Sequence, residues 1–140
     1  MTRKEFFDML GMAMPLTFVT CNMEACKHDS VIQPVSSAID FTIDLNDTQY
    51  SKLKNQGGFV FVPDKIDVIV AHTINDQYIA VSARCTHQGS LVAYYPSDIF
   101  FCSRHGASFA TDGTVKQGPA VAALTSFKTK LTGSKLRVYS

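Results

Sequence analysis

The sequence predicts an all-β fold, an antiparallel sandwich or barrel, and three observations carry this prediction. Short apolar runs recur at about ten-residue spacing along the body of the chain. Turn-forming residues, mostly glycine, proline, asparagine and aspartate, separate these runs. From residue 39 onward, no long segment has the 3.6-residue periodicity of a helix.

The expected elements follow in order along the chain. Residues 39–45 alternate apolar and polar side chains at period two, as a half-buried strand does, and Asn46-Asp47 end the pattern. Residues 48–54 fit one short helical turn. Further strands are expected at residues 59–62, 66–71, 77–81, 99–101, 126–131 and 135–139, with Thr132-Gly133-Ser134 as a hairpin turn between the last two.

Three other side chains of the body receive a structural interpretation. His72 ends an expected strand and is predicted to be a surface or loop histidine. Tyr94 and Tyr95 lie in the later part of the body, and the sequence favours packing over a docking role for both.

The chain divides into an expected export signal at residues 1–20, a linker at 21–38 and one domain at 39–140. The apolar run 6–19 follows the basic pair Arg3-Lys4. It is short for a bilayer span, which needs roughly 20 residues. The alternative is an ordinary amphipathic helix packed on the domain, and the protein would then be cytoplasmic.

The start of the chain resembles two kinds of export signal. Arg3-Lys4 with the following Phe6-Phe7 resembles the twin-arginine signal, and residues 18–21 resemble a lipoprotein cleavage box ending at Cys21. The resemblance implies a protein of the bacterial cell envelope, exported and held at the membrane by its signal or a lipid on Cys21. The role of Cys26 stays open.

Composition excludes several classes of partner and scaffold. The chain has 13 basic and 12 acidic residues, a net charge of +1 and no basic run, so we expect no nucleic-acid partner. Its four cysteines are too few and too unevenly placed for a disulfide-rich scaffold. No nucleophile–base set or phosphate-binding loop stands out, so no catalysis at a substrate pocket is expected.

Two short motifs carry the chemistry: Cys85-Thr-His87-Gln-Gly and Cys102-Ser-Arg-His105-Gly. Two thiolates and two imidazoles are the right set for a four-ligand metal site, and both zinc and iron–sulfur binding remain open on that count. The Cys-x-His spacing is tighter than the usual zinc gap. The glycines allow backbone amides to approach bridging sulfides, which a zinc site lacks. A non-redox, zinc-stabilised binding module remains the alternative.

The two motifs resemble the cluster-binding loops of Rieske [2Fe–2S] proteins, and residues 109–120 resemble the segment that follows the second loop in that family. The resemblance implies a Rieske-like sandwich or barrel with one [2Fe–2S] cluster. Cys85 and Cys102 would bind one iron, and His87 and His105 the other. The implied function is one-electron transfer between unidentified donor and acceptor proteins, as a small carrier or a subunit of a redox complex. A Rieske ferredoxin serving an oxygenase is the alternative within redox chemistry. Whether the protein is itself an enzyme stays open.

Within the family, the pattern is most similar to the cytochrome bc-type branch, with departures. The places of that branch's disulfide are Ser90 and Arg104 here, its usual serine is Ala107, and its usual tyrosine is Phe109. Both missing hydroxyls normally donate hydrogen bonds to sulfur and favour the reduced cluster. The resemblance therefore implies a potential in the lower half of the Rieske range, which runs from roughly −150 to +300 mV.

Overall fold

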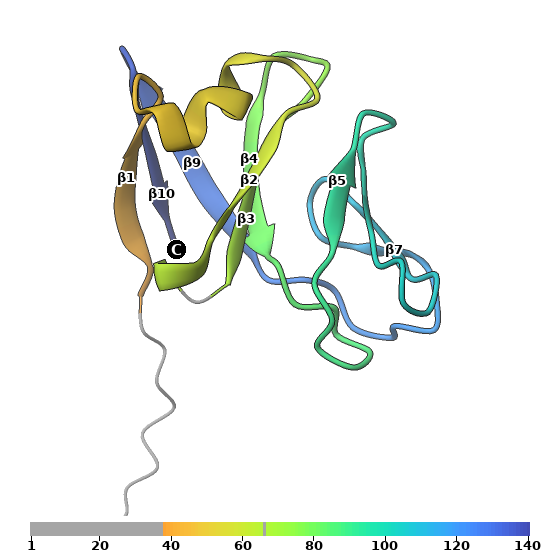
Figure 1. Cartoon of the computed structure of the whole chain (residues 1–140). Coiled ribbons are helices and arrows are strands. Elements are labelled where there is room, and N and C mark those ends of the chain that lie inside the picture. The colour runs from red at the N-terminus through yellow and green to blue at the C-terminus, as the bar shows by residue number, and fades with distance from the viewer. Residues whose placement is uncertain (1–37, 66) are drawn as a thin grey trace, which may run out of the picture. The chain divides into compact units, whose positions relative to one another are not determined.

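The computed structural model describes residues 38–65 and 67–140 (Figure 1). The chain divides into two units, and these residues belong to the second, Ser36–Ser140. The expected export signal, and all but the last residue of the expected linker, lie outside the described residues. In the described part of the chain, no helix is long and apolar enough to cross a membrane.

Six strands form the larger antiparallel sheet, in the order β1-β10-β9-β4-β3-β2. Their bounds are β1 (Asp40–Asp44), β2 (Phe59–Val62), β3 (Val68–His72), β4 (Tyr78–Ser82), β9 (Ser126–Thr132) and β10 (Lys135–Tyr139). Two 3-10 helices, η1 (Thr48–Lys54) and η2 (Pro63–Lys65), precede and follow β2. The side chain of Asp47 caps η1 by accepting the amide of Gln49, and the fully buried Leu53 anchors this helix.

Four short strands form the second antiparallel sheet, in the order β5-β6-β7-β8. They are β5 (Ala93–Tyr95), β6 (Ile99–Phe101), β7 (Ser108–Ala110) and β8 (Val115–Gln117). Figure 1 shows the chain passing from β4 to β5, and so from one sheet to the other, through a single connecting segment. That segment and the connection between β6 and β7 contain the two cysteine–histidine motifs.

Apolar side chains form two buried clusters, and β3 contributes to both. Val68 and Val70 belong to the cluster that also contains Leu53, whereas Ile69 and Ala71 belong to the cluster that contains Cys85. All five residues of β3 are buried because both faces of the strand are covered. This double burial explains the continuous apolar run in the sequence.

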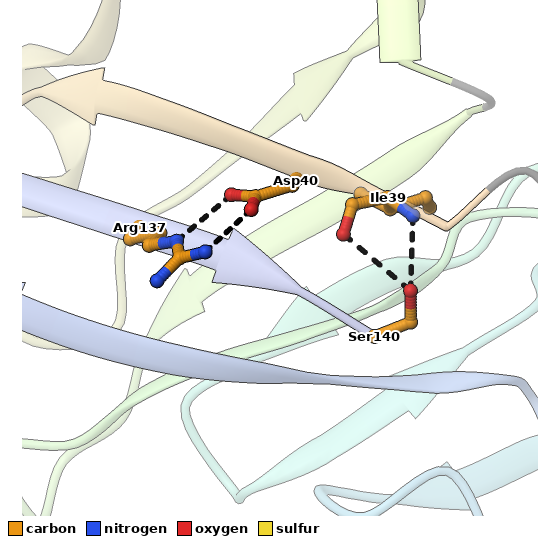
Figure 2. A network of polar contacts seen from close by, with 4 residues as sticks. All are labelled: Ile39, Asp40, Arg137 and Ser140. Atoms are coloured by element: carbon orange, nitrogen blue, oxygen red, sulfur yellow. Dashed lines mark hydrogen bonds and ion pairs between the residues drawn. The ribbon is translucent and has the colours of Figure 1, made fainter.

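Polar contacts hold β1, the first strand of the domain, against the last one. Asp40 accepts hydrogen bonds from the Arg137 guanidinium, with Nε at 2.8 Å from Oδ1 (Figure 2). Ser140 Oγ accepts the amide of Ile39 at 2.9 Å and donates to its carbonyl at 3.4 Å. The end of the chain therefore closes on the start of the domain.

The predicted elements agree closely with the structure. The all-β prediction is confirmed, and the predicted strands at 59–62, 99–101 and 135–139 have the observed bounds. The other predicted strands are present with slightly shifted ends, and the helical turn at 48–54 is η1. The strands β5, β7 and β8 were not predicted.

One of the single-residue predictions was wrong. His72 is not a surface histidine: it is 5% exposed, its Nε2 lies 2.9 Å from Asp76 Oδ1, and its ring stacks on Tyr78. Tyr95 is 45% exposed, but its ring packs edge to face against Phe101, with centroids 5.9 Å apart. The packing prediction is confirmed for Tyr94, which is 2% exposed.

Candidate metal centre

Each cysteine–histidine motif forms one short loop, the first loop at residues 85–90 between β4 and β5 and the second loop at residues 102–107 between β6 and β7. The glycine amide donates to the cysteine carbonyl in both, Gly89 to Cys85 at 2.8 Å and Gly106 to Cys102 at 2.9 Å. In both loops, the cysteine amide donates at 2.8 Å to the carbonyl of the residue after glycine. The two loops thus share one backbone hydrogen-bond pattern, although the histidine stands at a different position in each.

Glycine is required in both loops by backbone conformation. Gly89 has a φ of +72° and Gly106 a φ of +81°, in the left-handed region that side chains with a Cβ rarely adopt. A Cβ at either position would have no neighbouring atom within 4 Å, so crowding does not explain them. The left-handed residue allows each loop to turn back within hydrogen-bonding distance of its cysteine.

The loops bring the predicted ligands together in two pairs, cysteine with cysteine and histidine with histidine. Cys85 and Cys102 are 3% and 0% exposed, belong to one buried cluster and form no disulfide within the part of the chain that the structure describes. The rings of His87 and His105 lie edge to face, with centroids 4.8 Å apart. His105 is exposed and His87 is half-buried. The site therefore has a buried sulfur side and a more accessible imidazole side.

Two backbone amides influence the thiol of Cys85. Burial raises the pKa of the Cys85 thiol, hydrogen bonds from the amides of His87 and Gln88 lower it, and the neighbouring Cys102 raises it. The amides are the groups that would stabilise negative charge on a metal-bound sulfur. A bound cation would offset the burial cost, because coordination deprotonates a thiol outright.

One buried nitrogen fits a ligand role. His87 Nδ1 is buried and has no hydrogen-bond partner among the described residues. A buried polar atom without a partner costs about 1–3 kcal/mol, and coordination to iron would remove this cost. The donor set therefore fits a metal centre.

The grouping of histidine, cysteine and acidic side chains bears on whether the site could hold a single metal ion or a cluster. Within residues 38–65 and 67–140, no three histidine, cysteine or acidic side chains form a group that could hold a single ion. A [2Fe–2S] cluster needs no such group, because each iron takes two side chains and two bridging sulfides. Two pairs of ligands on facing loops match that requirement.

Three contacts of the first loop were missed in the sequence. Arg84 Nη1 donates to the Gly89 carbonyl at 3.2 Å, and Arg84 Nε pairs with Asp67. Thr86 Oγ donates at 2.6 Å to the carbonyl of Ala122, in the segment between β8 and β9. No sequence signal reveals the contacts with Asp67 and Ala122, because those partners stand 17 and 36 positions away.

The chain has clear relatives among characterised proteins. Residues 42–128 match the family model of the Rieske [2Fe-2S] domain. The chain is 36% identical over 81 residues to the cytochrome b6-f complex iron-sulfur subunit of Chlorobaculum tepidum, a match covering 57% of this chain and 43% of that protein. The chain therefore spans less than half the length of this relative.

Solved structures share the fold. The plasma membrane Rieske protein of Synechocystis PCC 6803 is 32% identical, with a TM-score of 0.54 over 66% of this chain and 95% of that chain. The ferredoxin of carbazole 1,9a-dioxygenase from Nocardioides aromaticivorans IC177 has a TM-score of 0.55 over 62% of this chain and 90% of that one. At 19% identity this second likeness shows the fold alone. The chain belongs to the Rieske [2Fe–2S] family, and its cofactor is a [2Fe–2S] cluster.

Proposed function

We propose that this protein carries single electrons through a Rieske cluster bound by Cys85 and Cys102 on one iron and by His87 and His105 on the other. One observation carries the proposal. The two loops share one backbone hydrogen-bond pattern, and they place the rings of His87 and His105 with their centroids 4.8 Å apart. The buried Nδ1 of His87, which has no hydrogen-bond partner among the described residues, adds support.

The ligand set defines the electrochemistry. When bound, the cluster supplies a one-electron couple, and neutral imidazoles in place of two thiolates leave it with two fewer negative charges. An electron enters a neutral centre more easily, which places Rieske potentials at roughly −150 to +300 mV. The exposed ring of His105 provides the point at which a partner protein approaches closely. Burial keeps Cys85 and Cys102 away from water.

We further propose that the carrier works at the membrane of the cell envelope, as a subunit or partner of a redox complex. Two relatives support this: one is a subunit of a cytochrome b6-f complex and the other a plasma membrane protein. In this proposal residues 1–20 are an export signal, Cys21 is the site of lipid attachment, residues 21–38 are a linker, and 39–140 are the Rieske domain. The donor and acceptor are redox proteins, so the protein is not a stand-alone catalyst.

The electron-transfer proposal is tested by spectroscopy of the whole protein, purified anaerobically. We expect a coloured protein and, after dithionite reduction, a rhombic electron paramagnetic resonance signal with an average g below that of an all-cysteine cluster. Cys85→Ser should abolish the signal, whereas Cys26→Ser, a matched cysteine outside the motifs, should keep it. A colourless protein holding about one zinc would instead support a structural metal site.

The location is tested separately in cells. Replacing both Arg3 and Lys4 by glutamine should leave the protein in the cytoplasm with its cluster intact, and Cys21→Ser should release it from the membrane fraction. Unchanged fractionation of both variants would contradict the proposed signal and lipid.

A further inference from the structure

The first loop begins beside a residue with unusual backbone geometry. Asp67 has a φ of +49°, in the left-handed region that is costly for a residue with a Cβ. Its carbonyl accepts the amide of Ala83 at 2.5 Å, and its carboxylate pairs with Arg84 Nε. Asp67 thus contacts both residues that lead into the loop.

Arg84 extends this contact across the loop. Its Nη1 donates to the carbonyl of Gly89 at 3.2 Å, while the Gly89 amide donates to the carbonyl of Cys85. We call these three residues, Asp67, Arg84 and Gly89, the Arg84 network. It connects the far end of the first loop to the residue before β3 in the six-stranded sheet.

The strand pairing beside the two loops differs in extent. The second loop connects β6 and β7, which pair with each other directly up to Phe101 and Ser108. The first loop connects β4 and β5, which belong to different sheets, and beside it the described residues form the single bridge between Arg84 and Leu91. A full strand pair therefore supports the second loop, whereas one bridge and the side chain of Arg84 support the first.

We propose that Arg84 is a positioning residue for the cluster: held by Asp67, it fixes the carbonyl of Gly89 and thereby the shape of the first loop. That shape keeps the amides of His87 and Gln88 directed at the Cys85 sulfur. The inference rests on the ligand assignment proposed above. Its consequence is that Arg84 governs cluster retention and potential although it binds no metal itself.

The effect should fall on the cluster more than on global stability. The side chains of Arg84 and Asp67 are 59% and 32% exposed, and exposed ion pairs contribute little to unfolding free energy. A loop with looser geometry, in contrast, opens more often to solvent and weakens the N–H···S hydrogen bonds that tune the potential.

The test is a double-mutant cycle on the whole protein, with the rate of cluster loss to a chelator as the readout. Arg84→Gln and Asp67→Asn should each speed the loss about three- to tenfold, in the lower part of the range that coupling of contacting residues gives. The double variant should be no faster than the faster single variant. Arg84→Lys should recover part of the effect, because lysine keeps the charge but not the two-armed guanidinium.

A matched control is available in the same sheet. Arg137 and Asp40 form a similar exposed pair on β10 and β1, strands that flank neither loop (Figure 2). Arg137→Gln and Asp40→Asn should lose the cluster at the rate of the unmodified protein. Circular dichroism of every variant checks that the fold is retained, and Arg84→Lys with Asp67→Asn completes the test if Arg84→Gln does not accumulate.

The midpoint potential separates positioning from plain charge. Positioning predicts that Arg84→Gln and Asp67→Asn both lower the potential, since both loosen the same loop. A through-space effect predicts opposite shifts, because one variant removes a positive and the other a negative charge. The proposal would be overturned by any of three results. The midpoint potentials of the two single variants could shift in opposite directions, the double variant could lose its cluster at the product of the two single effects, or the single variants could lose it at the rate of the unmodified protein. Absence of a cluster in the unmodified protein would instead contradict the function itself.

Discussion

Single side chains beside the sulfurs should determine how readily the cluster accepts an electron. Ala107 is fully buried in the cluster of side chains that contains Cys85 and Cys102, at the place of a family serine. Ala107→Ser should raise the midpoint potential, because a hydroxyl donor stabilises the reduced state. A hydrogen bond worth about 1 kcal/mol corresponds to roughly 40 mV for one electron. Redox titration measures the shift, and Ala110→Ser on β7 provides the control. An unchanged midpoint in Ala107→Ser would mean that the hydroxyl does not reach sulfur.

The hydroxyl group of Tyr94 should contribute to the stability of the fold. Its hydroxyl donates to Asp98 Oδ1 at 2.5 Å and lies against the amide of Ile74, so it connects the β5–β6 turn to the β3–β4 turn. Burial raises the pKa of Tyr94 well above its ordinary value, and Asp98 raises it further, so the phenol stays protonated. Tyr94→Phe should reduce the unfolding free energy by about 1–2 kcal/mol in denaturant titrations. Tyr95→Phe, at the exposed neighbour, should change it little; equal losses in the two variants would contradict this account.

At the scale of elements, the turn between β7 and β8 depends on a glycine for two reasons. Gly113 has a φ of +89°, and a Cβ there would lie 2.5 Å from the carbonyl oxygen of Leu124. Gly133, in the β9–β10 turn, has a φ of +60° but open space around it. Gly113→Ala should therefore cost more unfolding free energy than Gly133→Ala, for which about 1 kcal/mol is expected. Thermal or denaturant unfolding gives the comparison, and equal costs would show that crowding at Leu124 is relieved.

The pairing of β1 with β10 should respond to acid. Hydrogen bonds from Arg137 lower the pKa of Asp40 below its ordinary value of 3.8. A carboxyl whose folded pKa is lowered stabilises the fold above its unfolded pKa, and this contribution is lost as the pH falls through the folded pKa. Asp40→Asn should therefore lower the Tm slightly at neutral pH and leave it unchanged at about pH 2. The difference at neutral pH should shrink in 1 M salt; a difference independent of pH would exclude the ion pair as its cause.

Local sequence patterns predicted the longer strands and the metal motifs. Pairing between distant segments determined three short strands and the burial of His72. Residues 59–62 and 135–139 carry apolar runs bounded by turn residues, so their limits were visible in the sequence. The strands β5, β7 and β8 are as short as the predicted β6 but lack its run of three large apolar residues, and they exist because partners pair with them. His72 looked like a strand-end residue on the surface, but stacking on Tyr78 across the hairpin buries it.

Some features of the candidate site depend on residues close in sequence, and others on residues far apart in sequence. All four predicted ligands lie on the two loops, because cysteine, histidine and glycine at these spacings define the loop by themselves. The contact between Arg84 and Asp67 depends instead on the pairing of the first residue of β3 with the last residue of β4. Short-range motifs therefore locate the two loops, and only the fold reveals the side-chain contacts around them.

For the whole molecule, the expected midpoint potential follows from the combination of these features. The cysteines are buried and two loop amides lower the pKa of the Cys85 thiol, but Ala107 and Phe109 supply no hydroxyl to sulfur. Fewer donors leave the reduced cluster less stabilised, so the midpoint should lie below roughly +75 mV, the middle of the Rieske range. Dye-mediated titration of the whole protein, followed by the rhombic signal, measures it. A midpoint near +300 mV would contradict the argument and would point to another donor, with the buried Ser108 as the first to replace by alanine.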